Sequence, residues 1–323
     1  MTRLRIGVSK CLLGEAVRWD GGHKRDHFLN ETLAPFVTWV PLCPEVESGL
    51  PVPRDTMRLE TSPEGGTVVN GHLVRLIITK TGGDWTDEMA AWSAKKASAI
   101  AREGLDGFVL KKDSPSCGLE RVRIYGGAGP ASKTGRGVFA EALVQACPDL
   151  PVEDEGRLND PAIRENFIER VFAYRTLRDL FDGRWTVGAL VRFHTAHKLT
   201  LLAHQPTAYQ ALGRLVARAK GLGRAELRQQ YVHAFMEAMK AIATPGRHAN
   251  VLAHMAGYLR EHLDEPSRTE LRQTIEDHRR GHVPLVVPLT LLKHHARRHG
   301  VAYLLGQTYL DPHPKELALR NHV

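Results

Sequence analysis

Two different patterns of hydrophobic and polar residues divide the chain. In the first half, short stretches rich in branched apolar residues predict strands, and longer stretches with helical spacing of apolar residues predict helices. We expect strands at residues 4–8, 36–42, 73–79, 107–111 and 122–125, and helices at residues 86–102 and 138–146. Because strands and helices alternate, we predict an α/β domain with a mostly parallel sheet, which binds ligands beyond the carboxyl ends of its strands.

The second half has helical periodicity throughout, which predicts an all-α helical-bundle domain. Helices are expected at residues 161–181, 187–203, 207–219, 224–243, 247–263, 267–281 and 285–298. Prolines near their starts and glycines near several of their ends support these boundaries. A proline-containing acidic stretch over residues 148–160 separates the two patterns. We therefore place an α/β domain at residues 1–150 and a helical domain at residues 160–323.

The apolar stretches are too short to span a membrane. The longest covers residues 283–292 and contains Pro284 and Pro288, whereas a membrane-spanning helix needs about 20 apolar residues. Residues 1–10 also lack the apolar core of a secretion signal. Hydrophobic residues make up 42% of the chain and charged residues 25%, which is typical of globular proteins. We expect a folded cytoplasmic protein with no membrane partner.

Positive charge is concentrated in the second half. Residues 1–160 contain 20 Lys and Arg against 22 Asp and Glu, whereas residues 161–323 contain 24 against 14. Fourteen of the 17 histidines also lie in the second half. Clustered cations favour contact with phosphate groups, so the helical domain is predicted to bind RNA. The densest cationic runs are Arg214, Arg218, Lys220, Arg224 and Arg228, then Arg279 and Arg280, then Lys293, Arg297 and Arg298.

Three of the four cysteines follow predicted strands. Cys11, Cys43 and Cys117 each lie shortly beyond a strand end, beside proline or glycine, whereas Cys147 ends a predicted helix. Because the carboxyl ends of parallel strands share one edge of a sheet, the first three can converge on one site. Four cysteines are too few for a disulfide scaffold in a chain of this length. We interpret Cys147 as a residue outside the site.

The spacing of these cysteines leaves several chemistries open. A structural zinc site is disfavoured because no close Cys-x-x-Cys pair is present. A cysteine hydrolase would need a base from His23, His27 or His72, and it would leave two cysteines unused. A three-thiolate iron-sulfur cluster would use all three and leave one iron without a protein ligand. Buried, inert thiols are the remaining alternative.

Longer motifs around these cysteines resemble the bacterial thiouracil desulfidase family. They are VSKCLLG at residues 8–14, RWDGGHKR at 18–25, CPEV at 43–46, GLPVPR at 49–54 and KDSPSCG at 112–118. The resemblance implies that Cys11, Cys43 and Cys117 hold a 4Fe-4S cluster whose free iron takes the sulfur of a thiolated uracil. It also implies that Glu45 and Ser114 form the catalytic pair.

The second half resembles a helical domain found fused behind such desulfidases. The resemblance lies in FHTAHK at residues 193–198 and YLDPHPKEL at residues 309–317. When the two domains are fused, the family is associated with desulfuration of thiouridine in tRNA. We therefore expect thiolated tRNA as the partner and 4-thiouridine as the substrate. Free thiouracil or a thiouridine nucleotide is the alternative substrate, and a non-enzymatic, metal-containing RNA-binding protein is the alternative class.

Glu45 and Ser114 each have a second interpretation. Glu45 lies two residues beyond Cys43, where it can exchange a proton with an attacking water. It also follows Pro44, which suits a carboxylate in the first turn of a helix. Ser114 can orient the water, and it can equally be a Ser-Pro turn residue.

Further residues are candidates for binding the substrate. Asp20, His23, Lys24, Arg25 and Lys112 could clamp a nucleotide phosphate, although a solvated loop is the competing interpretation. We expect no nicotinamide or NTP cofactor. The segment from Gly127 to Thr134 departs from a phosphate loop because Ser132 replaces its second glycine.

Overall fold

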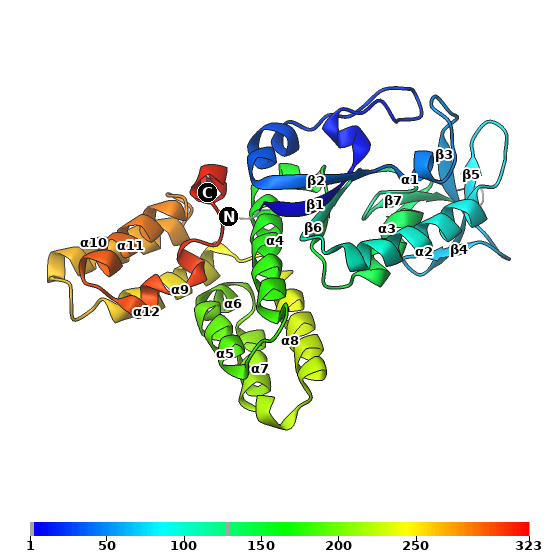
Figure 1. Ribbon diagram of the computed structural model, residues 1–323. Helices are drawn as coiled ribbons and strands as arrows, with labels where there is room; N and C mark the ends of the chain where they lie inside the picture. The colour runs from blue at the N-terminus through cyan, green and yellow to red at the C-terminus, as the bar shows by residue number, and fades with distance from the viewer. Residues whose placement is uncertain (1–2, 127–128, 323) are drawn as a thin grey trace. The chain divides into compact units, whose positions relative to one another are not determined.

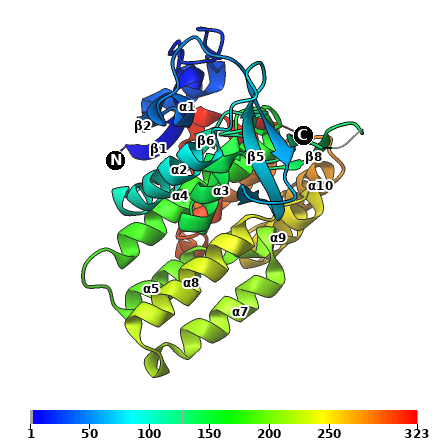
Figure 2. The same ribbon diagram turned by 90° about the vertical axis from the view of Figure 1, so that its right-hand side faces the viewer.

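The computed structural model describes residues 3–126 and 129–322. The chain divides into two compact units, Met1–Asn159 and Asp160–Val323. The first unit contains strands and helices, and the second is built from helices (Figures 1 and 2). The predicted fold class, an α/β domain followed by an all-α domain, is therefore confirmed.

A parallel sheet forms one part of the first unit. Its strand order is β2 (Val37–Leu42), β1 (Leu4–Ser9), β6 (Gly107–Leu110) and β9 (Val152–Asp154), and all neighbouring pairs are parallel. Every residue of β6 is buried, as expected for a strand covered on both faces. Strand β9 lies within the segment expected to be a linker, and it extends the sheet at the edge beyond β6.

A second sheet was not expected from the sequence. Its order is β4 (Thr67–Val69), β5 (His72–Ile78), β3 (Met57–Thr61), β7 (Val122–Tyr125) and β8 (Ser132–Gly135). Only the β3 and β7 pair is parallel. The prediction of one sheet was therefore wrong for β5 and β7, which pair with strands too short and too polar to stand out.

Gly127 lies outside the described residues, and Ser132 begins β8, where a phosphate loop would instead lead into a helix.

Two long helices pack beside each other in the first unit. They are α2 (Thr86–Glu103) and α3 (Val138–Ala146), and they lie side by side in Figure 1. Met89 of α2 and Val138 of α3 join the apolar core of the second sheet. Phe139 of α3 packs edge-on against Phe108 of β6, with ring centroids 5.9 Å apart. The two helices thus contribute to the cores of both sheets. The shorter elements are η1 (Lys10–Leu13), η2 (Phe28–Leu33), η3 (Ala34–Phe36), α1 (Pro44–Glu47) and η4 (Arg157–Asn159).

The helices of the second unit form two apolar clusters. The helices are α4 (Pro161–Phe181), α5 (Val187–Ala196), α6 (Lys198–His204), α7 (Pro206–Ala217), α8 (Arg224–Met239), α9 (Pro245–Tyr258), α10 (Glu265–Arg279), α11 (Val286–Arg298) and α12 (Ala302–Leu305). A short 3-10 turn, η5 (Ala219–Gly221), lies between α7 and α8, and three more follow α12: η6 (Thr308–Leu310), η7 (Lys315–Leu317) and η8 (Leu319–Asn321). Leu201 of α6 packs with the α4, α5, α7 and α8 cluster, whereas Leu199 packs with the α9 to α12 cluster. Helix α6 therefore joins the two clusters.

The helix expected at residues 187–203 is interrupted at His197, which separates α5 from α6. Backbone groups near the break are bonded by a distant segment. Gln307 Nε2 donates to the Thr195 carbonyl at 3.0 Å, and Thr308 Oγ1 donates to the Ala196 carbonyl at 3.0 Å. Because these partners lie 112 residues away in sequence, local periodicity could not reveal the interruption.

No helix in the ranges 3–126 and 129–322 combines the length and apolar character needed to cross a membrane.

Candidate active site

The structure brings three cysteines into the walls of one pocket of about 440 Å³ in the first unit. Cys11 follows β1, Cys43 follows β2, and Cys117 lies in the loop after β6. Because β1, β2 and β6 are parallel neighbours, their carboxyl ends meet at the same edge. Cys147 instead ends α3 and is not among the residues that line the pocket.

Burial raises the pKa of each thiol in the pocket. The pKa of Cys11 rises to about 12, mainly through burial. Burial also raises the pKa of Cys43 and brings that of Cys117 well above its ordinary value, with further increases from the charges of Cys43 and Glu45. Three thiolates in one pocket therefore repel one another unless a cationic group binds them. This donor set is suited to a metal centre.

The donor set of the pocket fits an iron-sulfur cluster. Cys11, Cys43 and Cys117 line the pocket together, and cysteine thiolates are the ligands that hold such clusters. Among the described residues, no group of three or more His, Cys, Asp or Glu side chains is placed to hold a single metal ion. The chemistry of the donor set, three thiols in one pocket, therefore fits the group that the sequence resemblance implies.

The loop that carries Cys117 is fastened to the start of α3. The backbone N–H groups of Val138 and Phe139 donate to the carbonyls of Pro115 and Ser116 at 3.0 and 2.9 Å. This approach requires glycine at position 137, because a Cβ there would lie 2.4 Å from the Ser116 carbonyl. The helix thus fixes the backbone on both sides of Ser116.

The Glu45 carboxylate is hydrogen-bonded by residues on two sides of the pocket. Arg54 Nε donates to Glu45 Oε2 at 3.0 Å, and the Nη2 of the same guanidinium pairs with the same oxygen. On the other side, Ser116 Oγ donates to Glu45 Oε1 at 2.7 Å and Ser114 Oγ at 3.3 Å. The carboxylate is 16% exposed and Arg54 is 4% exposed. Glu45 therefore has a fixed orientation at the wall that also carries Cys43 and Cys117.

The alternative interpretations of Glu45 and Ser114 describe part of what the structure shows. Glu45 does lie in the first turn of α1, but Glu47 Oε1 is the carboxylate oxygen that accepts from the Cys43 N–H, at 3.1 Å. Ser114 Oγ accepts from the N–H groups of Ser116 and Cys117 at 3.3 and 3.2 Å, as a turn residue does. Ser114 thus shapes the loop and also reaches Glu45.

The five predicted substrate-binding residues do not all lie at the pocket. Lys24 and Lys112 line it, and their ammonium groups form no ion pair among residues 3–126 and 129–322. Asp20, His23 and Arg25 are absent from the lining. Arg25 pairs with Glu31 at 3.2 Å, and His23 Nδ1 accepts from the Arg25 N–H at 3.2 Å. Asp20 accepts from the Gly22 N–H at 3.0 Å. These three residues shape the loop beside the pocket.

Arg54, Ser116 and Trp19 also contribute to the site, although no role was expected for them from the sequence. Arg54 and Ser116 hold Glu45, and Trp19 lines the pocket while 45% exposed. All three lie inside the motifs that carry the family resemblance. A tryptophan in a polar segment that contains two glycines was the signal available in the sequence for a ring accessible to a ligand.

The fold and the pocket define a class of protein in which a three-thiol site lies at the edge of a parallel sheet. Comparisons with known proteins agree with that class. A family model described as 2-thiouracil desulfurase matches residues 6–155. A second, described as a protein of unknown function (DUF1722), matches residues 198–314.

Two curated relatives are similar to parts of the chain. The uncharacterized protein YbgA of Escherichia coli (strain K12) is 35% identical over 153 residues, which cover 47% of this chain and 90% of that protein. The uncharacterized protein YbbK of Bacillus subtilis (strain 168) is 36% identical over 157 residues, which cover 48% of this chain and 98% of that protein. A solved structure of the 4Fe-4S-dependent thiouracil desulfidase TudS is 29% identical, with a TM-score of 0.39, and covers 50% of this chain and 98% of that one. The chain belongs to the 2-thiouracil desulfurase family and carries a DUF1722 domain behind the family domain.

Proposed function

We propose that this protein is an iron-sulfur-dependent desulfidase that converts thiouridine in tRNA, specifically 4-thiouridine, to uridine and hydrosulfide. The observation that carries the proposal is one pocket that joins three thiols to a fixed carboxylate. Membership of a family described as 2-thiouracil desulfurase supports the reaction class.

Cys11, Cys43 and Cys117 are the residues that would hold a 4Fe-4S cluster, with one iron lacking a protein ligand. When bound, the cluster supplies a Lewis-acidic position for the sulfur of the thiocarbonyl group. The overall reaction is a hydrolysis, in which the ring carbon gains the oxygen of water and loses sulfur as hydrosulfide. No electron is gained or lost, so no external reductant is needed.

Glu45 is the proposed proton acceptor for the attacking water, and it returns the proton later in the reaction. Arg54 holds Oε2, and the serine hydroxyls bond Oε1, so the carboxylate does not rotate freely. Ser114 and Ser116 are also able to pass a proton because their hydroxyl oxygens lie 2.9 Å apart. Lys24 and Lys112 at the pocket suit the phosphate groups that flank the base.

The charge of the second unit supports a folded RNA as the carrier of the base. Arg214, Arg218 and Lys220 are exposed, and they form no ion pair within the part of the chain that the structure describes. Arg279 and Arg280 are paired with Glu276, which reduces their charge for a partner. A groove of about 710 Å³ is lined by Arg297, Arg298 and Lys315, and also by Lys293, whose charge is reduced for a partner by its ion pair with Asp311. These cations would contact phosphates, and the base would be presented out of its stack to the cysteine pocket.

The first test measures iron and acid-labile sulfide in protein purified without oxygen. We expect about four of each per chain, lost in Cys11→Ala, Cys43→Ala and Cys117→Ala and kept in Cys147→Ala. Hydrosulfide release from tRNA that contains 4-thiouridine is then compared between the wild type and Glu45→Gln. Glu45→Gln should keep its iron and lose turnover, whereas Glu60→Gln, a carboxylate in a more exposed ion pair, should retain both. Iron-free wild type, or full turnover by Glu45→Gln, would contradict the proposal.

The family description favours a second candidate substrate, because it names the free base 2-thiouracil. The two candidates differ in how affinity depends on salt. Binding of tRNA through several phosphate contacts weakens steeply with salt, whereas a free base shows almost no dependence. Replacing Arg214, Arg218 and Lys220 by serine should reduce the salt slope for tRNA by about 2 to 3. An unchanged slope, with normal turnover of free thiouracil, would favour the free base.

A further inference from the structure

The carboxyl end of β6 is joined to the segment that follows β9 in the first unit. The two strands are parallel neighbours, with Leu110 opposite Asp154. Lys111 and Glu155 follow these strands and come next to each other, and the Glu155 N–H donates to the Leu110 carbonyl at 3.1 Å. The stretch expected to be a linker therefore lies against Lys111 and Lys112, which both line the cysteine pocket.

Glu155 bonds to the two lysines through different groups. One carboxylate oxygen pairs with the Lys111 ammonium group, and the other accepts from the Lys112 N–H at 2.7 Å. Lys111 Nζ also donates to the Lys112 carbonyl at 3.1 Å. The charge of Lys111 is thus balanced by Glu155, whereas the ammonium group of the exposed Lys112 has no ion-pair partner among the described residues.

Gly156 sets the path of the Lys112 side chain. A Cβ at position 156 would lie 2.2 Å from Lys112 Cδ, 3.1 Å from Cε and 3.2 Å from Nζ. The lysine stem therefore occupies the space that a larger residue would fill. The backbone here is itself held, because the Asn159 side-chain amide donates to the Gly156 carbonyl at 3.2 Å and to the Glu155 carbonyl at 3.3 Å. The φ of Gly156 lies outside the left-handed region, so glycine is needed for the close approach alone.

We propose that Lys112 selects substrates whose base is attached to a phosphate-bearing sugar, and that Gly156 is the positioning residue that directs Lys112 to the phosphate. A lysine ammonium group recognises phosphate as a compact charge with several donors. This inference rests on the proposed function and extends it, because the pocket of the first unit would itself distinguish a nucleotide from a free base. The shared chemistry is a phosphate ester, which is a monoester in a free nucleotide and a diester in RNA.

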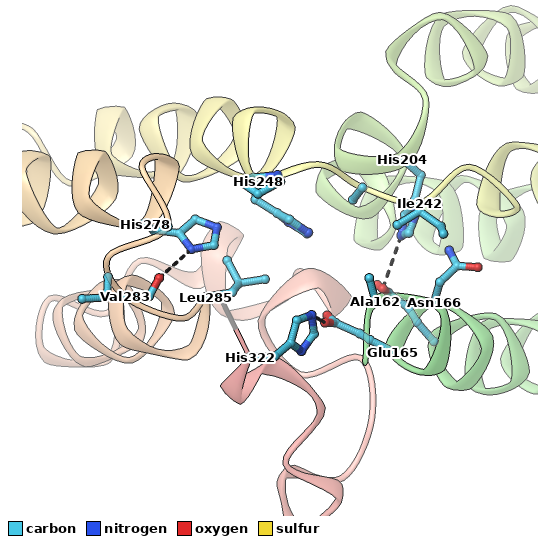
Figure 3. Close-up of a pocket in the computed structure, with 14 residues that line it drawn as sticks. Ala162, Glu165, Asn166, His204, Ile242, His248, His278, Val283, Leu285 and His322 are labelled. Atoms are coloured by element: carbon cyan, nitrogen blue, oxygen red, sulfur yellow. Dashed lines mark hydrogen bonds and ion pairs between the residues drawn. The ribbon is translucent and has the colours of Figure 1, made fainter. Parts of the chain in front are cut away.

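The cavity of the second unit is a poorer site for a phosphate group. It has a volume of about 190 Å³, and its lining includes Glu165, Glu169 and His204 (Figure 3). Arg320 donates to Glu165 at 3.0 Å, and His204 Nε2 lies 3.3 Å from Glu169 Oε2. A phosphate in this cavity would lie beside two carboxylates that already face these cations, which is unfavourable.

The experiment is calorimetric titration of the full chain, purified without oxygen, with uridine 5′-monophosphate, with the dinucleotide UpU and with uridine. The three ligands carry the product base with a phosphate monoester, with a diester and with no phosphate. Lys112→Ala should weaken binding of a phosphorylated ligand about tenfold, the effect of one hydrogen bond to a charged group. It should leave the affinity for uridine unchanged. The ligand that shows the loss identifies the monoester or the diester as the group that Lys112 contacts.

Gly156→Ala tests the positioning without removing the charge. The three atoms nearest to the new Cβ all belong to the flexible Lys112 side chain, so the lysine should be displaced while the fold is kept. We expect about the same tenfold loss for the phosphorylated ligand, and no further loss when Gly156→Ala is combined with Lys112→Ala. The controls are Gly129→Ala, whose Cβ would meet open space, and Lys95→Ala, an exposed lysine outside the pocket lining. Both should leave all affinities unchanged, and circular dichroism melting shows whether each variant is folded.

Unchanged affinity for both phosphorylated ligands in Lys112→Ala would overturn the proposal, because the nucleotide would then bind elsewhere, as in the groove lined by Arg297 and Arg298. Equal affinity of the wild type for all three ligands would also overturn it. A further loss in the double variant would refute the role of Gly156, since the new Cβ would then act through the fold. Iron content and hydrosulfide release, measured on the same samples, report the desulfidase proposal independently, because binding of these product ligands requires no turnover.

Discussion

Replacing Arg54 by methionine tests whether the orientation of Glu45 matters for turnover. The substitution keeps most of the apolar stem and removes the guanidinium that holds Glu45 Oε2. It also removes bonds of 3.0 Å to the Val17 carbonyl and 3.2 Å to the Pro51 carbonyl. Among the described residues, the Glu45 carboxylate would then keep only its hydrogen bonds with Ser114 and Ser116.

The structure sets the size of the expected effect. Breaking a buried ion pair by removing one partner costs about 3 to 5 kcal/mol. Because Glu45 is 16% exposed, water can partly replace the lost donors, and we expect the lower end, about 3 kcal/mol. Turnover should fall by about 10² to 10⁴, the contribution of a positioned proton-transfer group. Arg54→Lys keeps the charge but loses the paired geometry, so it should recover only part of the loss.

The control is Arg58→Met, which removes an exposed partner of Glu60 and should cost under about 1 kcal/mol. Unfolding in urea is followed by tryptophan fluorescence, since Trp19, Trp39, Trp85 and Trp92 lie in the first unit. Turnover is followed by hydrosulfide release at measured iron content. The catalytic interpretation predicts a lower kcat with KM little changed. The reasoning would be refuted if Arg54→Met matched Arg58→Met in kcat, or if the loss disappeared after correction for iron content.

Three further predictions concern single side chains. Ser116→Ala removes the 2.7 Å hydrogen bond to Glu45 and should lower kcat about tenfold at unchanged iron content. Ser114→Ala removes a longer bond of 3.3 Å and should lower kcat by less. A larger loss of kcat in Ser114→Ala than in Ser116→Ala would contradict this geometry. Trp19→Ala removes an exposed ring, so the free energy of unfolding should change by under about 0.5 kcal/mol, while KM should rise about tenfold if the base stacks there. Burial lowers the pKa of His197 to about 4, so its contribution to stability is complete above about pH 6.5 and is lost as the pH falls toward 4. Urea unfolding at several pH values between about 4 and 6.5 gives the slope of the free energy of unfolding against pH. This slope should be smaller in His197→Phe than in the wild type by about 1.4 kcal/mol per pH unit. Equal slopes in the two proteins would show that His197 is protonated when folded.

The parts of the fold that the sequence predicted are those with strong local patterns. The strand expected at residues 122–125 and the helices at 138–146 and 161–181 match the observed boundaries. The second sheet was missed because β3, β4 and β8 are short and carry polar residues, so their pairing depends on distant partners. The same reason explains the break at His197, where bonds from Gln307 and Thr308 hold the backbone.

The part of the site that could be predicted from the sequence is the part whose residues directly follow parallel strands. Parallel strands bring Cys11, Cys43 and Cys117 to one edge, and this could be inferred from their positions after strands. The contacts of Glu45 could not be inferred, because Arg54 and Ser116 reach it from segments nine and 71 residues away. A loop rich in charge and glycine suggested four binding residues, and the segment after β6 suggested Lys112 as a fifth, but only the structure shows that Lys24 and Lys112 line the pocket.

The contacts of Glu45 link the carboxylate to the backbone that carries the cysteines. Glu45 itself is two residues after Cys43, and Ser116, its partner at 2.7 Å, immediately precedes Cys117. Ser116 is in turn fixed by the start of α3, because Phe139 N–H donates to its carbonyl. A displacement of either cysteine would therefore move the carboxylate or its donor, so the distance between the thiols and the proton acceptor is set by the same short segments. This coupling explains why a carboxylate can remain aligned in a pocket formed by loops from three separate strand ends.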